Sequence, residues 1–433
     1  MSSVAFSQPL QRAILRAIDT WSSARGQVAF PCIPQQFENY VRRFQLLFES
    51  LGRPFSPREL TQFANAYKQQ LDRGARQGRN LLVTVNYEPG KPPHRGLVCR
   101  SSIVDLNREK ASSEGVISLP CIPQARSLYE GRLAHVFSAL GHPLEPKEVE
   151  QIGQKLEQKL RLGFEQSPYS RLIVRYARNP QAPREFLCGI EVLEQSIDDR
   201  ARSLVGNDDR LLFGSAADAK VRDIAAKLQP EHGPVLDIGA GTGRNAIALA
   251  RSGFAVDAVD LSAAFLERLS ETARQESLSV NTIKGDILDP EWTPERDRYQ
   301  WVVAASVLPH LKTVEQLGQV MSKLCESLRS PGQLLVNLFI SKDDYEPDPL
   351  VLELAHVLDS FLVTRSQWEA TIAPLPLQVV SDESVVDYEK NHLPPENWPP
   401  TPWFQNWATG RRLFPVEQGK PPTELRWILL QKP

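Results

Sequence analysis

The stretch that decides the fold is PVLDIGAGTGRNAIALARSG, residues 234–253. An apolar segment that carries an acid, Asp237, is followed by a glycine-rich turn and then by an amphipathic helical pattern. Glycines let the backbone approach a ligand closely, and the first turn of the next helix offers N–H groups without intrahelical partners. The pattern predicts a strand–turn–helix unit that binds a nucleoside.

The spacing of the glycines separates two kinds of nucleoside ligand. A dinucleotide-binding turn has the pattern G-x-G-x-x-G and seats a pyrophosphate on the helix N-terminus. Here Gly239, Gly241 and Gly243 form G-x-G-x-G, and Asp237 precedes them on the strand. A carboxylate in that place would repel a pyrophosphate, but it suits the cationic amino-acid end of S-adenosylmethionine (SAM).

Further apolar segments follow in an order that predicts alternating strands and helices. FAVDAVD ends at Asp260, 17 residues after Gly243, and IKGDILD contains Asp286. YQWVVAASVLPHL predicts a strand that opens into a loop, and PGQLLVNLFI predicts the next parallel strand after an intervening helix. SDESVVDYEKN and ELRWILLQKP are interpreted as a closing antiparallel pair.

With these motifs in order, residues 211–433 resemble a class I SAM-dependent methyltransferase. The resemblance implies a Rossmann-like α/β fold with a seven-stranded SAM-binding sheet, SAM as the cofactor, and methyl transfer as the reaction. It also implies that Asp260 binds the ribose hydroxyls, that Asp286 contacts the adenine amino group and that Ile287 packs on the ring. The implied cofactor-binding residues are Asp237, Gly239, Ala240, Gly241, Gly243, Asp260, Leu261, Asp286, Ile287 and Ala305.

Two features bear on the methyl acceptor. GTGRN at residues 241–245 and the closing ELRWILL are similar to tellurite-resistance-type small-molecule methyltransferases. The asparagine–proline motif of enzymes that methylate exocyclic amino groups is absent, because Ser306-Val307-Leu308-Pro309 occupies its place. We therefore expect a small-molecule acceptor first, a peptide or protein second and RNA third. The alternative from another class is a non-catalytic interaction protein that binds SAM.

His310 is the candidate catalytic residue, because it alone of the seven histidines falls on a motif, just past the fourth strand. Displacement at a sulfonium needs a general base only where the nucleophile must lose a proton. His310 is therefore interpreted as a base or a substrate contact, and the alternative is a packed or solvated loop histidine.

A stretch rich in proline and tryptophan, residues 392–415, lies between the two presumed closing strands. Prolines stiffen a long connection, and indoles supply large apolar area at a low entropy cost. This stretch is either a rigid lid over the substrate mouth or a loop packed on the protein's own surface.

The front half of the chain contains an internal repeat. FPCIPQ at residues 30–35 recurs as LPCIPQ at residues 119–124, and the same offset of 89 also matches Tyr87 with Tyr176. Each copy predicts a strand, two helices and two further strands. The chain is therefore expected to be a tandemly duplicated α+β module followed by the methyltransferase domain. The predicted boundaries are 25–105 for the first repeat, 114–195 for the second and 206–433 for the SAM-binding domain.

The repeat also mirrors four cysteines, Cys32, Cys99, Cys121 and Cys188. They would be either a four-thiolate zinc site across the pseudo-twofold axis or small apolar residues packed between strands. No pair has the short spacing of structural zinc sites, so packing is favoured and no metal is predicted.

Charge and composition limit the partners. Residues 1–100 carry 14 basic and 6 acidic residues, whereas residues 201–433 carry 23 and 32. The basic first repeat is a possible site for an anionic or peptide partner; the alternatives are docking between the two halves and a solvated face. No apolar stretch approaches a membrane span, no secretion signal is evident, and the five cysteines form no CxxC pair. We expect a cytoplasmic protein without membrane association.

Overall fold

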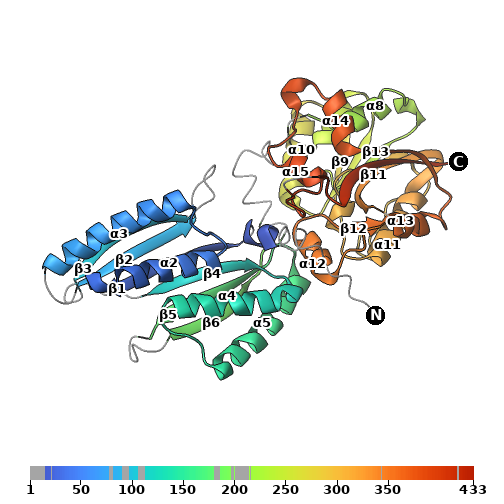
Figure 1. The fold of residues 1–433 in the computed structure, drawn as a ribbon. Coiled ribbons are helices and arrows are strands. Elements are labelled where there is room, and N and C mark those ends of the chain that lie inside the picture. Colours follow the sequence, from blue (N-terminus) through green and yellow to red (C-terminus); the bar gives the residue numbers. More distant parts are fainter. Residues whose placement is uncertain are drawn as a thin grey trace. The chain divides into compact units, whose positions relative to one another are not determined.

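The computed structural model describes residues 15–20, 22–77, 81–89, 97–105, 113–179, 186–196, 199, 214, 216–342, 344–416 and 419–433. These residues form two compact units, Leu15–Glu194 and Gln195–Pro433 (Figure 1). Most of the connection between the units, including the gap between the predicted boundaries at 195 and 206, lies outside the described residues. Among the described residues, no helix combines the length and the apolar character needed to cross a membrane.

The N-terminal unit is built on a six-stranded antiparallel sheet with the order β3-β2-β1-β4-β5-β6. Both halves of the unit have the same succession of elements, and the bounds of α2 and α4 differ by the predicted offset of 89 residues. This common order supports the duplication, which stays a prediction. The first half contains β1 (Ser23–Pro31), η1 (Pro34–Gln36), α2 (Phe37–Ser50), α3 (Pro57–Gln77), β2 (Leu81–Pro89) and β3 (Leu97–Asp105). The second half contains β4 (Glu114–Pro120), η2 (Pro123–Ala125), α4 (Arg126–Ala139), α5 (Pro146–Gln166), β5 (Arg171–Arg178) and β6 (Phe186–Leu193).

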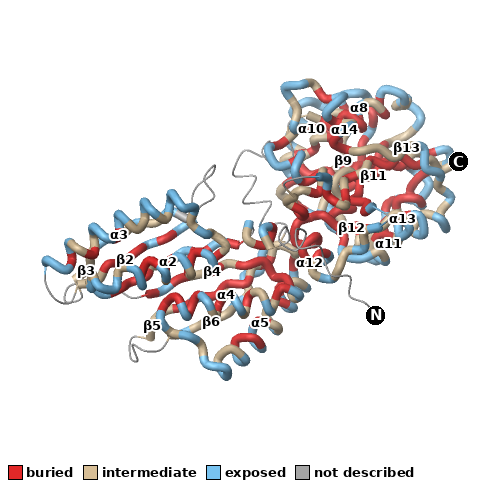
Figure 2. The backbone as a smooth tube through the Cα atoms, viewed as in Figure 1, coloured by how far each residue is buried: buried red, intermediate tan, exposed pale blue. Residues whose placement is uncertain are grey.

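Four helices cover one face of this sheet, and their buried positions face it (Figures 1 and 2). Helix α2 buries Tyr40, Phe44, Leu47 and Phe48, which follow the spacing of one helical stripe. The Phe44 ring meets that of Tyr67 from α3 edge-on, with ring centroids 5.2 Å apart. The second half repeats the stripe with its own residues on α4.

A glycine on each long helix lies against a cysteine of the same repeat. A Cβ atom built on Gly74 would overlap Cys32 Sγ, and one built on Gly163 would overlap Cys121 Sγ. The two cysteines therefore pack beneath their helices, and burial raises the pKa of the Cys121 thiol to about 12. Among the described residues, no group of three or more His, Cys, Asp or Glu side chains is placed to hold a metal ion.

The C-terminal unit is built on a sheet with the order β13-β14-β11-β10-β7-β8-β9, to which the short strand β12 adds by pairing with β11. Strands β7 to β11 run parallel, and β14 is antiparallel to both β11 and β13. This order confirms the predicted Rossmann-like α/β sheet. The strands are β7 (Val235–Ile238), β8 (Val256–Asp260), β9 (Val280–Lys284), β10 (Tyr299–Ala304), β11 (Leu328–Ser341), β12 (Leu362–Thr364), β13 (Gln378–Ser384) and β14 (Thr423–Lys432).

The central strands are buried on both faces because helices cover the sheet from two sides. Every residue of β7 and β10 is buried, which explains why their sequences are mostly apolar and do not alternate; Asp237 and Gln300 are the buried polar residues of the two strands. The helices are α8 (Ala219–Ala225), α9 (Arg244–Arg251), α10 (Ala263–Gln275), α11 (Val314–Ser327), α12 (Pro349–Val357), α13 (Arg365–Ile372), α14 (Val385–His392) and α15 (Phe404–Ala408). Three short 3-10 turns complete the unit: η3 (Pro230–His232), η4 (Leu308–His310) and η5 (Pro395–Asn397).

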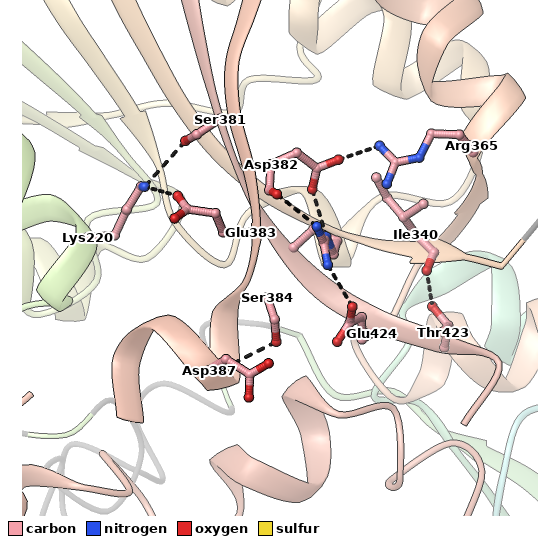
Figure 3. Close-up of polar contacts among 11 residues, drawn as sticks. Lys220, Ile340, Arg365, Ser381, Asp382, Glu383, Ser384, Asp387, Thr423 and Glu424 are labelled. Carbon is pink, nitrogen blue, oxygen red and sulfur yellow. Dashed lines mark hydrogen bonds and ion pairs between the residues drawn. The ribbon is translucent and has the colours of Figure 1, made fainter. Parts of the chain in front are cut away.

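Charged side chains hold the closing strands and α8 together (Figure 3). Asp382 on β13 accepts hydrogen bonds from Arg365 of α13 and from Arg426 of β14. Lys220 of α8 reaches β13 at Ser381, with Nζ and Oγ 3.3 Å apart, and at Glu383. These contacts occupy the edge strand with charges, which disfavours pairing with another chain.

The structure corrects one expectation about the closing pair. Only the first residues of SDESVVDYEKN are strand, because β13 ends at Ser384 and the rest forms helix α14. The Ser384 hydroxyl accepts a hydrogen bond from the Asp387 amide and caps the helix. The apolar pair Val385–Val386 begins the buried stripe of the helix and does not continue the strand.

We expect Gly163→Ala to lower the stability of the protein, although alanine favours a helix more than glycine does. The added Cβ would overlap Cys121 Sγ, and overpacking of this kind costs about 1–3 kcal/mol. Thermal unfolding of the full chain measures the effect. Gly131→Ala on α4 is the matched control, because its Cβ meets nothing within 4 Å and should leave stability unchanged or raise it. Equal stabilisation by both substitutions would contradict the packing argument.

Candidate functional site

Three predicted acids lie at one edge of the C-terminal sheet. Asp237 lies near the end of β7, Asp260 ends β8, and Asp286 follows the last residue of β9 by two positions. The three strands are adjacent and parallel, so their carboxyl ends meet at the same edge. Asp237 and Asp260 are close enough for the charge of one to raise the pKa of the other. Asp286 shares the edge, without a direct contact to either acid among the described interactions.

The glycine turn between β7 and α9 needs glycine for two reasons. Gly239, Gly241 and Gly243 have φ values of +69°, +57° and +96°, which side chains rarely adopt. A Cβ on Gly239 would also overlap the side chain of Val307, and one on Gly243 would overlap Leu269. The turn is therefore packed tightly against the loop after β10 and against helix α10.

The turn is also tied to the neighbouring strand by hydrogen bonds. The Ala240 amide donates to the carbonyl of Val259 on β8, with 3.0 Å between the two atoms. The Gly241 amide donates to Asp260 Oδ2 at 2.8 Å, and the Ser262 amide donates to Asp260 Oδ1 at 2.8 Å. These bonds fix the Asp260 carboxylate, and a carboxylate can accept hydrogen bonds from several donors at once. Leu261, next in the chain, is 41% exposed and offers apolar surface beside it.

Asp237 is the buried charge of the site. The residue is 2% exposed, and its Oδ2 atom has no hydrogen-bond partner. Desolvation raises the pKa of this carboxyl to about 7. Arg244 and the Ala246 amide lie near enough to oppose that rise. The hydrogen bonds of Arg244 go to Asp218, at 2.9 Å for one of them, and to the Ala216 carbonyl at 3.4 Å. A ligand that brings a cation would supply the missing partner, so Asp237 fits the ammonium of SAM.

The other residues implied for the adenine contact have mixed surroundings. Asp286 Oδ1 accepts a hydrogen bond from the Leu288 amide at 2.8 Å, which closes a turn after β9. Ile287 is buried in the hydrophobic core of the unit. Ala305 follows β10 directly and is half-buried. Their contacts with adenine stay predictions.

The loop after β10 carries His310 and is fixed by a hydrogen bond to the buried side-chain amide of Asn337. Ser306 has a φ of +60°, and its amide donates to Oδ1 of Asn337 on β11, with N and O 2.7 Å apart. The His310 side chain is 44% exposed at the end of η4. Its Nδ1 atom lies 3.1 Å from Oδ1 of Asp359. The candidate catalytic histidine is therefore accessible and has an acidic partner.

The stretch rich in proline and tryptophan packs on the core of its own unit. Trp407 is buried, its indole donates to the Asp359 carbonyl at 2.8 Å, and its ring meets Phe339 edge-on at 5.4 Å. Phe414 is also fully buried, whereas Trp403 is partly exposed. The stretch thus contacts the partner of His310 through Trp407. This burial supports the interpretation of a packed loop, and a lid over the substrate mouth stays a prediction.

A buried polar network beside the glycine turn was not predicted. Asn245 exchanges two hydrogen bonds with Asp218, both at 3.0 Å, and Arg244 pairs with the same carboxylate. Glu389 accepts from the amide of Ala219 at 2.7 Å and from other groups of α8 and β14. Arg244 and Asn245 were visible in the motif GTGRN, but nothing local in the sequence identifies their partners.

The comparisons agree with this arrangement. Residues 235–332 match the family model described as "Methyltransferase domain". No curated protein matches the sequence. The family match, the strand order and the glycine turn identify the C-terminal unit as a class I methyltransferase domain of the Rossmann-like type. It is a SAM-dependent methyltransferase domain, and SAM is its cofactor.

Solved structures similar to the chain include three methyltransferase-related proteins. The geranyl diphosphate C-methyltransferase from Streptomyces coelicolor A3(2) is 14% identical with a TM-score of 0.36, covering 54% of this chain and 80% of that one. TehB from Haemophilus influenzae is 18% identical with a TM-score of 0.34, covering 60% and 79%. A putative sarcosine dimethylglycine methyltransferase from Galdieria sulphuraria is 17% identical with a TM-score of 0.37, covering 49% and 83%.

We expect the affinity for S-adenosylhomocysteine, which keeps the ammonium of SAM, to depend on pH through Asp237. Burial raises the pKa of this carboxyl to about 7, so below that pH a proton must leave before the cation can bind. The affinity should fall by about tenfold for each pH unit below 7 and level off above it. Isothermal titration calorimetry over this range measures the dependence.

The variant Asp237→Asn is the control for that experiment. It should bind more weakly than the unchanged protein at and above pH 7, approach the same affinity well below pH 7, and lose the dependence. Burial also raises the pKa of Glu389 to about 7, so a dependence that survives in Asp237→Asn would belong to Glu389. Affinity that is constant with pH in the unchanged protein would contradict the role of Asp237.

Proposed function

We propose that the protein transfers a methyl group from SAM to a small-molecule acceptor at the carboxyl edge of β10 and β11. The buried Oδ2 atom of Asp237 carries the proposal, because it has no hydrogen-bond partner. Arg244 and the Ala246 amide offset only part of the cost of burying this carboxylate, whereas the ammonium of SAM would pair with it directly. When bound, SAM supplies an activated methyl group on a sulfonium. The protein's part is to orient the two reactants and keep water out.

Two observations support a small acceptor. The loop after β10 has Ser306-Val307-Leu308-Pro309 where enzymes that methylate exocyclic amino groups have asparagine and proline. Packing of Trp407 against Phe339 and Asp359 brings bulky side chains beside the loop that carries His310. A crowded acceptor side favours a compact substrate over a folded macromolecule. The cytoplasmic location remains a prediction.

We expect methyl transfer from labelled SAM to the small-molecule filtrate of a cell extract, and less to the retained macromolecules. S-adenosylhomocysteine release and label in each fraction are the measurements, and Asp237→Asn supplies the background. Label only in protein would favour a peptide or protein acceptor, and label only in RNA would favour RNA. Binding of SAM without turnover on any fraction would favour a SAM-binding interaction protein.

We further propose that the N-terminal module recruits an acidic polypeptide to the enzyme. A hollow of about 680 Å³ supports this, on the sheet of the N-terminal unit. It is defined by fourteen residues: Arg25, Gly26, Gln27, Asn86, Tyr87, Glu88, Val98, Arg100, Glu114, Gly115, Val116, Arg175, Tyr176 and Ala177.

The charges of this hollow favour an anion that carries polar groups. Arg25 and Arg100 are exposed and have no ion-pair partner among the described residues, whereas Arg175 pairs with Glu191 outside the lining, at 2.8 Å. Glu88 and Glu114 also line the hollow, so it suits a mixed polypeptide better than a uniform polyanion. The lining tyrosines, Tyr87 and Tyr176, are buried and bonded to each other, so they offer no platform on which RNA bases could stack.

Reversing the two unpaired charges, Arg25→Glu with Arg100→Glu, should weaken binding of a labelled glutamate-rich peptide by about tenfold or more. Fluorescence anisotropy at low salt measures the affinity, and added salt should weaken the interaction. Arg161→Glu on α5 is the matched control, because that side chain lies outside the hollow. Equal binding by all three proteins, or tighter binding of an RNA oligonucleotide than of the peptide, would contradict the proposal.

A further inference from the structure

Helix α12 ends in a capping motif that has an unusual residue at its left-handed position. The Ser360 amide donates to the Ala355 carbonyl at 2.8 Å, and the Asp359 amide donates to the His356 carbonyl at 3.2 Å. This pair of bonds is the Schellman motif, whose left-handed position is normally glycine. Here that position is Asp359, with a φ of +52°. An aspartate accepts a backbone cost there that glycine would avoid.

The contact made by the Asp359 side chain explains why an aspartate occupies this left-handed position. Its Oδ1 atom lies 3.1 Å from Nδ1 of His310, across 49 positions of the sequence. The carboxylate side chain is 10% exposed, whereas the imidazole is 44% exposed. The buried member of the pair is therefore the acid, and the histidine faces outward.

The backbone around the pair is fixed from two further directions. The Asp359 carbonyl accepts a hydrogen bond from the Trp407 indole at 2.8 Å. The Phe361 amide donates to the Pro309 carbonyl at 2.9 Å, which ties the end of α12 to the turn that carries His310. Acid and imidazole are thus held in place by bonds that do not involve their own side chains.

A carboxylate at Nδ1 selects one form of the neutral imidazole. Asp359 can only accept, so Nδ1 carries the hydrogen and Nε2 keeps its lone pair. Among the described residues, His356 lies near both members of the pair, and Lys312 lies near His356. Burial and the charge of Lys312 lower the pKa of His356 to about 4, so this second ring is neutral near pH 7.

We propose that Asp359 is a positioning residue that holds His310 as a general base, and that the acceptor is therefore a nucleophile that carries a proton, such as a hydroxyl or an ammonium. This inference rests on the proposed methyl transfer and names the class of its substrate. A thiolate or another acceptor without a proton would need no such base.

The proposed methyl transfer forms one bond to carbon, breaks another and moves one proton. The acceptor oxygen or nitrogen forms a bond to the methyl carbon, and the bond between that carbon and sulfur breaks with its electron pair on sulfur. The proton of the acceptor passes to Nε2 of His310, and Asp359 stabilises the resulting imidazolium. The proton later leaves to water, so the products are the methylated acceptor, S-adenosylhomocysteine and one proton.

Two substitutions test the role of Asp359 in the full-length protein. Asp359→Gly suits the left-handed position, so the melting temperature should stay the same or rise, whereas kcat should fall by about tenfold or more. Asp359→Asn also tolerates this backbone, and it should lower kcat similarly without changing KM or the affinity for S-adenosylhomocysteine. Full kcat in either variant would overturn the proposal.

Asp297→Gly is the matched control for the backbone effect. Asp297 is another aspartate with a positive φ, +49°, but its side chain is exposed and pairs with Lys432 at 3.1 Å. Its replacement should leave kcat unchanged. A loss of kcat equal to that of Asp359→Gly would show that glycine at such a position impairs the enzyme by itself and would overturn the assignment.

A measurement that needs no turnover separates this inference from the proposed function. Nitrogen-15 NMR of labelled histidine, with the His310 signal assigned from His310→Gln, should show hydrogen on Nδ1 in the unchanged protein. In Asp359→Asn this preference should be lost. Hydrogen on Nε2 in the unchanged protein would overturn the inference even if methyl transfer were established. Failure to bind SAM would refute the proposed function while leaving the NMR result intact.

Discussion

The cofactor site of the C-terminal unit depends on one buried carboxylate, that of Asp237, whose Oδ2 atom is shielded from solvent and has no hydrogen-bond partner. Strand β7 is buried at every position, so the carboxylate cannot reach solvent. The nearest guanidinium, that of Arg244, is already committed to Asp218. Burying a carboxylate costs several kcal/mol. Arg244 and the Ala246 amide offset only part of that cost, because the pKa of Asp237 stays raised. A cationic ligand offsets the unfavourable free energy of burying Asp237, so binding of the cofactor should raise the stability of the domain.

Features with a local physical cause were predictable from the sequence. Apolar runs, glycine turns and helical stripes depend on neighbours in the chain, so the motifs predicted the strands β7, β8 and β9 and the turns that follow them. The repeated FPCIPQ and LPCIPQ segments likewise led to two runs of elements with the same succession. The boundary at Ser384 was missed, because two valines continue a strand as readily as they begin a helix, and the capping hydroxyl decides between them.

Features that depend on distant pairing were not predictable. His310 was singled out by its motif, but its partner Asp359 lies 49 positions away at a helix end that glycine usually occupies. Asn337 was visible only as a polar residue in an apolar strand, and its bond to Ser306 arises from the neighbouring strand. Asp218 and Glu389 carried no local signal at all. Periodicity in the sequence predicts which residues lie at the edge of the sheet. Their hydrogen-bond partners can be identified only from the three-dimensional structure.

The burial of cysteines in the N-terminal module lowers their reactivity. Burial raises the pKa of Cys99 and Cys121 to about 12 and that of Cys188 to about 11. At neutral pH the Cys121 thiol is therefore almost entirely protonated. Peroxide and electrophiles attack the thiolate, so these sulfurs are poor targets. The module should keep its fold and its hollow while the surrounding redox balance changes, and alkylating reagents should label it slowly unless it unfolds.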